Sequence, residues 1–253
     1  QVELAEKLLH LAKAPEGSAV FFCNSGTEAL EAAIKLARRT GRTGIVAAEG
    51  AFHGRSTGAL ALTHKPAYRE PFEPLIPGVS HVPWGDSDAL RAAVTEDTSA
   101  LVLDPIQGEA GVRPADTAYL RLARELTREV GALLILDEVQ TGIGRTGSWF
   151  GFQQAGVVPD AITLAKGLGG GVPIGALVTF GPTVSTMLTP GNHGSTFGGN
   201  PLACAVGEAV LDTINTPEVL AGVKAKHVLF ASRLQAMGEK YGIFTEVRGL
   251  GLL

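Results

Sequence analysis

Short apolar runs recur along the chain, and most are followed by glycine or polar residues and then by a segment with helical spacing. These runs lie at residues 19–23, 45–48, 100–103, 132–136 and 161–164. Runs of this length with such flanks are typical of buried parallel strands. The segments between them, among them 29–37 and 117–129, place apolar residues at helical intervals. The pattern predicts an α/β fold in which a mostly parallel sheet carries helices on both faces.

The ends of the chain and one internal segment depart from this alternation. Residues 2–13 predict a helix, whereas the proline-rich segment 64–83 is expected to be a surface loop. Near the other end, Thr216 followed by Pro217 predicts a helix start. The helix carries apolar residues three or four apart, which we interpret as a packing seam: Leu220, Val223, His227, Phe230, Leu234, Met237 and Tyr241.

These features divide the chain into three parts. Residues 1–14 are expected to be the remnant of an N-terminal segment, and 15–214 a large domain. Residues 215–253 are expected to be a linking helix and the start of a C-terminal domain. The chain lacks an initial methionine and ends within what resembles a new strand, so we expect it to be an internal piece of a longer protein.

Composition narrows the class of protein. Of 253 residues, 45% are hydrophobic and 18% charged, as in an ordinary soluble globular protein. A net charge of −4 gives no electrostatic reason to expect nucleic acid or an anionic membrane as a partner. The only cysteines, Cys23 and Cys204, form no disulfide framework, and no apolar stretch reaches the length of a membrane span. A cytoplasmic location is therefore expected.

Two chemically distinctive residues follow neighbouring apolar runs. Asp137 comes directly after 132–136, and Lys166 lies two residues after 161–164, before a run of glycines. Ligands of open α/β sheets bind outside the carboxyl ends of the strands, so these two side chains are expected to share a site. A lysine in this position can form a Schiff base, which is how pyridoxal phosphate is held.

Pyridoxal phosphate sets further demands that other residues of the chain meet. Its pyridine nitrogen needs an acid, and Asp137 supplies one. Its phosphate needs a helix N-terminus, and Ser25 with Glu28 fits a capping box at the start of a predicted helix. Its ring needs packing on both faces, for which Phe52 and Val139 are candidates.

Other interpretations account for fewer of these residues. In a protein without a cofactor, Asp137 and Lys166 would form a buried ion pair. This interpretation does not explain the glycines and the helix cap that accompany them. Gly142–Gly147 matches G-x-G-x-x-G, yet no helix pattern follows it, which argues against a nicotinamide dehydrogenase. The scattered histidines give no metal-ligand spacing, so no metal is expected.

Six motifs stand in order along the chain: NSGTEA at 24–29, FHGR at 52–55, PIQGE at 105–109, LDEVQTGIGR at 136–145, LAKGLGGG at 164–171 and HGSTFGGNP at 193–201. Together they resemble the class III (fold type I) pyridoxal-phosphate aminotransferases, and among these most closely the acetylornithine aminotransferases. The similarity covers essentially the whole chain.

The resemblance implies a role for each matching position. Lys166 would bind the cofactor covalently and move the proton, and Asp137 would pair with the pyridine nitrogen. The remaining implied cofactor-binding residues are Ser25, Gly26, Thr27, Phe52, His53, Val139, Gln140, Ser195 and Thr196, of which the last two would come from the partner in a homodimer. Arg55 would bind the substrate α-carboxylate, Glu109 would switch between substrates, and Ser195 would also contact substrate.

The implied reaction moves the δ-amino group of N-acetylornithine to 2-oxoglutarate in arginine biosynthesis. Ornithine or 4-aminobutyrate aminotransferase, an aminomutase of the same fold, and a cofactor-free or regulatory relative stay as alternatives. The chain departs from the family where Asp104 replaces the usual Glu and Ala110 the usual Gly. Both flank Glu109 and are expected to shift its reach.

Overall fold

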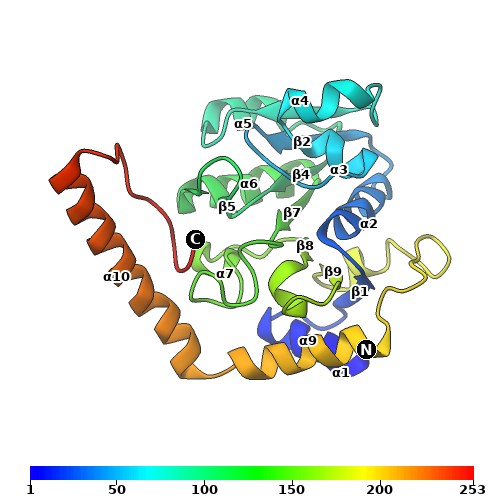
Figure 1. The fold of residues 1–253 in the computed structure, drawn as a ribbon. Coiled ribbons are helices and arrows are strands. Elements are labelled where there is room, and N and C mark those ends of the chain that lie inside the picture. The colour runs from blue at the N-terminus through cyan, green and yellow to red at the C-terminus, as the bar shows by residue number, and fades with distance from the viewer.

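The computed structural model describes residues 1–253 and contains a seven-stranded sheet of order β1-β9-β8-β7-β4-β2-β3 (Figure 1). Its strands are β1 Ala19–Cys23, β2 Gly44–Ala48, β3 Val79–Val82, β4 Thr98–Leu103, β7 Leu133–Asp137, β8 Ala161–Leu164 and β9 Gly175–Thr179. All neighbouring pairs are parallel except those of β9, which runs antiparallel to both β1 and β8. The predicted, mostly parallel sheet is confirmed.

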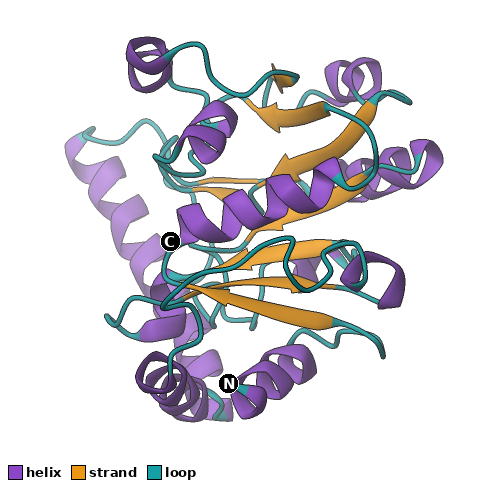
Figure 2. Ribbon diagram, turned by 90° about the vertical axis from the view of Figure 1, so that its right-hand side faces the viewer, coloured by secondary structure: helices purple, strands orange, loops and turns teal.

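Helices lie on both sides of the sheet, as Figure 2 shows. They are α1 Val2–Leu11, α2 Gly26–Arg38, α3 Thr57–Leu62, α4 Pro66–Arg69, α5 Ser87–Ala93, α6 Thr117–Val130, α7 Phe152–Ala155, α8 Pro182–Ser185, α9 Pro201–Ile214 and α10 Pro217–Tyr241. Two 3-10 turns, η1 Glu70–Phe72 and η2 Lys166–Gly169, and a small ribbon of β5 Ile106–Gln107 with β6 Arg113–Pro114 complete the fold. None of the helices combines the length and apolarity needed to cross a membrane.

The sheet separates two apolar cores, because alternate residues of a strand point to opposite faces. In β7, Leu134 and Leu136 belong to the core that also contains residues of α1, α6 and α9. Leu133 and Ile135 belong to the core under α2 and α3. Each such leucine contributes about 1.5–3 kcal/mol by leaving water. Burial on both faces explains why the central strands are continuously apolar in the sequence.

The segment 64–83 is not simply a surface loop, so this expectation was wrong. It contains α4, η1 and the strand β3, which pairs with β2 alone and forms an edge of the sheet. Ser80 is exposed and Val82 buried, because an edge strand is only partly covered. A short strand with polar residues and prolines before it lacks the apolar signal that marks the central strands.

The start of α10 follows the prediction, but its packing seam does not. The Thr216 side chain accepts a hydrogen bond from the Val219 amide and caps the helix. Of the seam residues only Val223 is buried, whereas Phe230 is 57% and Tyr241 59% exposed. The outer half of this long helix is only partly covered, by the chain that follows it: Phe230 and Leu234 line a cavity together with residues 247–249 and 251–253.

The proposed division at 14/15 and 214/215 stays a prediction. Leu4 and Leu8 of α1 are fully buried in the same core as the central strands, so α1 packs as part of the large domain's interior. Cys23 and Cys204 are both buried free cysteines. Burial raises the pKa of the Cys23 thiol to about 12, which keeps it in the unreactive form.

Candidate active site

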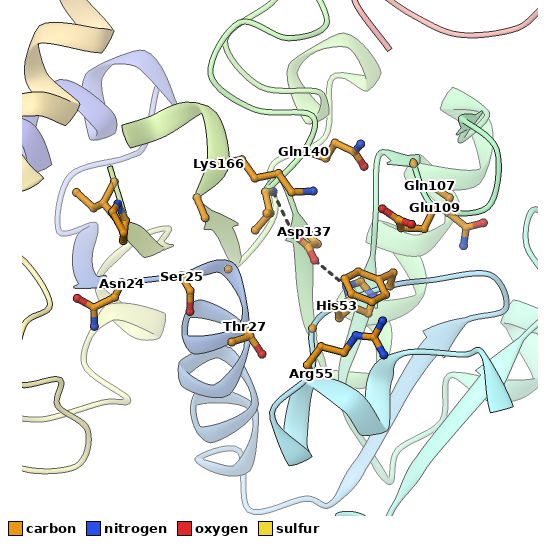
Figure 3. A pocket seen from close by; sticks show the side chains of 18 of the residues that line it. Asn24, Ser25, Thr27, His53, Arg55, Gln107, Glu109, Asp137, Gln140 and Lys166 are labelled. Carbon is orange, nitrogen blue, oxygen red and sulfur yellow. Dashed lines mark hydrogen bonds and ion pairs between the residues drawn. The ribbon is translucent and has the colours of Figure 1, made fainter. Parts of the chain in front are cut away.

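A cavity of about 450 Å³ opens at the carboxyl ends of the central strands (Figure 3). Its wall is formed by segments that follow β1, β2, β4, β7 and β8, together with the loop before β9. The lining residues are Asn24–Thr27, Gly50, Phe52–Arg55, Gln107–Glu109, Asp137, Val139, Gln140, Ala165, Lys166 and Gly171–Ile174. The structure thus brings Asp137 and Lys166 into one site, where the sequence placed them.

Asp137 ends β7 and is held on several sides. It is 5% exposed, and its Oδ1 accepts hydrogen bonds from the Val139 amide and the Thr163 hydroxyl, each at 3.0 Å. Its Oδ2 lies 2.7 Å from His53 Nδ1. A buried carboxylate with this many partners stays in one orientation, so the face that lines the cavity is fixed.

His53 lies behind Asp137 and connects it to a second carboxylate. Its Nε2 is 3.8 Å from Asp104 Oδ2. Burial disfavours the charged ring, but Asp104 and Asp137 outweigh it and raise the pKa of His53. Burial also raises the pKa of Asp104 above its usual range. Although His53, Asp104 and Asp137 are close enough to hold a metal ion, the His53–Asp137 hydrogen bond favours their role as a buried chain that supports Asp137.

The structure places the Asp104 side chain beside His53. Its expected effect on the reach of Glu109 stays a prediction. Ala110 packs against Gly50: a Cβ added at Gly50 would lie 3.1 Å from the Ala110 Cβ.

Lys166 occupies a strained position between β8 and η2. Its φ of +40° lies in the left-handed region, which non-glycine residues rarely adopt. Such outliers persist where the surroundings over-determine them, and they gather at functional sites. In Figure 3 the Lys166 and Gln140 side chains lie on one side of the cavity, with Asp137 below them. Gln140 packs against Gly108, where a Cβ would lie 1.8 Å from its Oε1.

The N-terminus of α2 forms another wall. The Ser25 hydroxyl caps the helix by accepting a hydrogen bond from the Glu28 amide. The Glu28 carboxylate accepts in return from the Asn24 amide, whereas a capping box would use the Ser25 amide. At Gly26, a Cβ would lie 3.0 Å from both methyl groups of Val139. The first amides of a helix have no partners within it, so this end provides donors for an anion.

Arg55 is placed by contacts between α2 and α3. The Thr27 hydroxyl lies 2.7 Å from the Ser56 hydroxyl, and Glu31 bonds the Ser56 hydroxyl and accepts from the first amides of α3. Gly54 is required before Arg55, because its φ is +141° and a Cβ would lie 2.3 Å from Thr27 Oγ1. The Arg55 side chain consequently reaches the cavity from below in Figure 3.

The other predicted residues fall into two groups. Phe52, Val139 and Glu109 line the cavity, Glu109 from an exposed position in the turn between β5 and β6. Ser195 and Thr196 do not line it: Ser195 Oγ accepts from Asn24 Nδ2 at 3.0 Å, and Thr196 is exposed. They lie outside the cavity of their own chain.

Sequence reasoning missed several residues that shape the site. Asn24 and Gln107 line the cavity, and Gln107 is 1% exposed with its Nε2 bonded to the Glu49 carbonyl. Thr163 lies inside an apolar run and supports Asp137 from the adjacent strand. Thr163 could have been found from the sequence, because a hydroxyl in a fully buried strand needs a hydrogen-bond partner.

Glu138, next to Asp137, is a further buried acid. It is 0% exposed, bonds the Thr141 hydroxyl, and accepts from the amides of Gly151 and Phe152 at 2.9 and 2.8 Å. Burial raises its pKa to about 7. These bonds tie the loop after β7 to the start of α7, on the side of Asp137 away from the cavity.

We expect Glu138→Gln to lower the free energy of unfolding by about 1–3 kcal/mol, because the amide group turns a donor toward backbone N–H groups that need an acceptor. Equilibrium denaturation in urea measures the change. Glu129→Gln, at an exposed position of α6, is the matched control and should leave the midpoint unchanged. Equal stability of the two variants would show that the three bonds contribute nothing.

Comparison with known proteins agrees with this site. The family model described as aminotransferase class III matches residues 1–253. The chain is 52% identical to acetylornithine aminotransferase of Pseudomonas putida over 99% of its own length and 64% of that protein. It is also 52% identical to the succinylornithine transaminase/acetylornithine aminotransferase of Pseudomonas aeruginosa, over 100% of the chain and 63% of the relative.

Solved structures give the same fold. The ornithine aminotransferase of Toxoplasma gondii superposes with a TM-score of 0.93 at 32% identity, over 100% of this chain and 62% of that one. A second structure of that enzyme is described as having partial occupancy of PLP, pyridoxal phosphate, at the active site. The chain belongs to the class III aminotransferases. It spans under two thirds of the length of these relatives.

Proposed function

We propose that the protein is a pyridoxal-phosphate-dependent aminotransferase that moves the δ-amino group of N-acetylornithine to 2-oxoglutarate. The observation that carries the proposal is one cavity that combines Lys166, Asp137, the N-terminus of α2 and Arg55. Acetylornithine aminotransferases at about half identity support the substrate. The reaction would serve arginine biosynthesis, and a cytoplasmic location is part of the proposal.

The residues of the cavity fit the cofactor. The helix start at Gly26 and Thr27, capped by Ser25, would hold the phosphate. Because Thr27 Oγ1 is already bonded to Ser56, backbone amides would make this contact. Asp137 would accept a hydrogen bond from the protonated pyridine nitrogen, and His53, with Asp104 behind it, would keep Asp137 in its charged form.

The ring and its substituents would meet the other walls. Phe52 and Val139 would cover its two faces, and Gln140 would reach the ring hydroxyl. Glycine at position 26 lets Val139 pack against the start of α2, because a Cβ there would lie 3.0 Å from both Val139 methyl groups. When bound, pyridoxal phosphate supplies an electron sink that stabilises negative charge at the substrate carbon.

The protein's own groups would then handle the proton and the substrate. Lys166 would bind the cofactor covalently and, once displaced by substrate, move the proton at the reacting carbon as general base and acid. Arg55 would bind the α-carboxylate through its paired N–H donors. Glu109, exposed in the β5–β6 turn, would change its position between the two substrates, so that one site accepts both the amino donor and glutamate. These roles extend the predictions made from the sequence.

A homodimer is part of the proposal. Ser195 and Thr196 lie outside the cavity of their own chain, whereas the resemblance assigns both to the cofactor site. Beside them Phe197 and Leu202 are each 72% exposed, an apolar surface that a second copy of the chain would cover. With that copy in place, Thr196 and Ser195 would complete the neighbouring phosphate site.

Comparison of amino donors tests the substrate. We expect kcat/KM with 2-oxoglutarate as acceptor to be highest for N-acetylornithine and lower by about tenfold or more for ornithine and 4-aminobutyrate, since an acyl group adds buried apolar area. Release of glutamate is measured. N-succinylornithine is the fourth donor, because one relative carries both names. Faster turnover of ornithine or 4-aminobutyrate would contradict the assignment, and absence of glutamate would point to an aminomutase.

Arg55→Lys tests carboxylate binding. A single ammonium cannot make the paired hydrogen bonds of a guanidinium, so KM for N-acetylornithine should rise by about tenfold while the visible absorption of the bound cofactor stays unchanged. Steady-state kinetics give the result. Arg91→Lys, on α5 away from the cavity, is the control. Unaltered KM in Arg55→Lys would remove Arg55 from this role.

A further inference from the structure

Arg55 is surrounded by aromatic rings and not by acids. Its guanidinium carbon lies 3.7 Å from the centre of the Tyr68 ring and 5.3 Å from that of Phe52. The two rings meet edge to face, with centres 6.3 Å apart. None of the ion pairs in the structure involves Arg55. Its position therefore depends on contact with ring faces.

Tyr68 does not itself line the cavity. It belongs to α4, which begins at Pro66, in the segment that follows α3 and precedes the edge strand β3. The ring is half-buried, and Lys65 Nζ lies 4.6 Å from its centre and 3.5 Å from its hydroxyl. Tyr68 thus reaches the site only through Arg55.

A ring face can hold a guanidinium without using up its N–H groups. A cation over an aromatic face is attracted by the electron density of the ring, and this attraction needs no hydrogen-bond acceptor. An ion pair with Glu or Asp would fix Arg55 equally well, but it would occupy the paired donors that a substrate carboxylate needs. Contact with the rings also restricts the rotamers of the long, exposed Arg55 side chain, so less conformational entropy is lost when substrate binds.

We propose that Tyr68 is a positioning residue for substrate binding: its ring holds the Arg55 guanidinium at the cavity with the N–H donors free for a substrate carboxylate. The inference rests on the proposed function, in which Arg55 binds that carboxylate. It assigns a role in recognition to α4, which forms no part of the cavity wall. Because the contact acts on binding in ground state and transition state alike, it affects KM and leaves kcat nearly constant.

Kinetics of Tyr68 variants in the holoenzyme test the proposal. Tyr68→Leu should raise KM for N-acetylornithine and for 2-oxoglutarate by about three- to tenfold, with kcat within about twofold. Tyr68→Phe keeps the ring face and should restore KM to the wild-type value. Phe72→Leu is the matched control, since Phe72 lies on the neighbouring turn η1 and is 64% exposed with no cation over its ring.

A double-mutant cycle separates positioning from general damage. In an Arg55→Ala background, Tyr68→Leu should raise KM no further, because the side chain that it positions is gone. An equal rise in both backgrounds would overturn the proposal and leave Tyr68 a structural role. So would an unchanged KM in Tyr68→Leu, provided that Arg55→Ala raises KM. An unchanged KM in Arg55→Ala would instead contradict the proposed function of Arg55.

Discussion

Replacing Lys166 by alanine is expected to lower kcat by at least about 10³-fold, because the variant loses both the covalent link to the cofactor and the group that moves the proton. Its visible absorption band with pyridoxal phosphate should disappear as well. The backbone should tolerate the change, since alanine adopts the left-handed φ of this position as readily as lysine does. Steady-state glutamate release and an absorption spectrum measure both effects.

The control for this variant is Lys7→Ala. Lys7 lies on α1 and pairs with Glu208 and Asp212, away from the cavity. It should keep wild-type kcat and the same spectrum. Turnover by Lys166→Ala comparable to that of Lys7→Ala would mean that another group does the chemistry, and the proposed site would be wrong.

Asp137→Asn is expected to lower kcat by about 10²–10³-fold with little change in fold. The substitution keeps the shape but removes the negative charge that would keep the pyridine nitrogen protonated, and the protonated ring is the group that would stabilise negative charge at the reacting carbon. It also turns an amide toward His53 or toward the donors Val139 and Thr163, so one existing bond is weakened. Single-turnover absorbance changes with N-acetylornithine isolate the chemical step.

Asp160→Asn is the control for Asp137→Asn, because it removes a carboxylate charge from the sheet away from the site. Asp160 directly precedes β8, at the opposite end of the strand from Lys166, where it pairs with Arg124 and accepts from the Leu134 amide. This variant should lose stability and keep kcat per folded molecule. A normal chemical step in Asp137→Asn, or an equal loss in Asp160→Asn, would contradict the role assigned to Asp137.

The central strands were predictable because each is buried on both faces. In β4, β7 and β8 nearly every position has to be apolar, so the run itself marks the strand. The edge strand β3 was missed because Ser80 and His81 face surroundings that do not demand apolar residues. The direction of β9 was not predicted either, since antiparallel pairing leaves no mark in the run Gly175–Thr179.

The site was predictable where a residue and its strand end are adjacent in sequence. Asp137 is the last residue of β7, Lys166 comes two residues after the end of β8, and the α2 cap follows β1. Contacts between distant segments were not predictable in this way. Asp104 meets His53, and Tyr68 meets Arg55, across separations that no local pattern encodes. For the same reason the sequence suggested Glu109 as the partner affected by Asp104.

The helix α10 shows the opposite case, in which a clear apolar pattern is only partly covered by the rest of the chain. Its apolar residues at three- and four-residue spacing predict burial, yet Leu234 and Met237 are 37% and 43% exposed. The helical prediction itself was correct from Pro217 onward. Periodicity specifies which face of a helix is apolar, and it does not specify what covers that face.

The most direct test of the account is to locate the bound cofactor. The protein is incubated with pyridoxal phosphate, treated with sodium borohydride, digested and analysed by mass spectrometry. The account predicts a phosphopyridoxyl group on Lys166 alone, in the peptide that follows β8. Modification of another lysine, or none in a folded protein that shows no visible band, would contradict it.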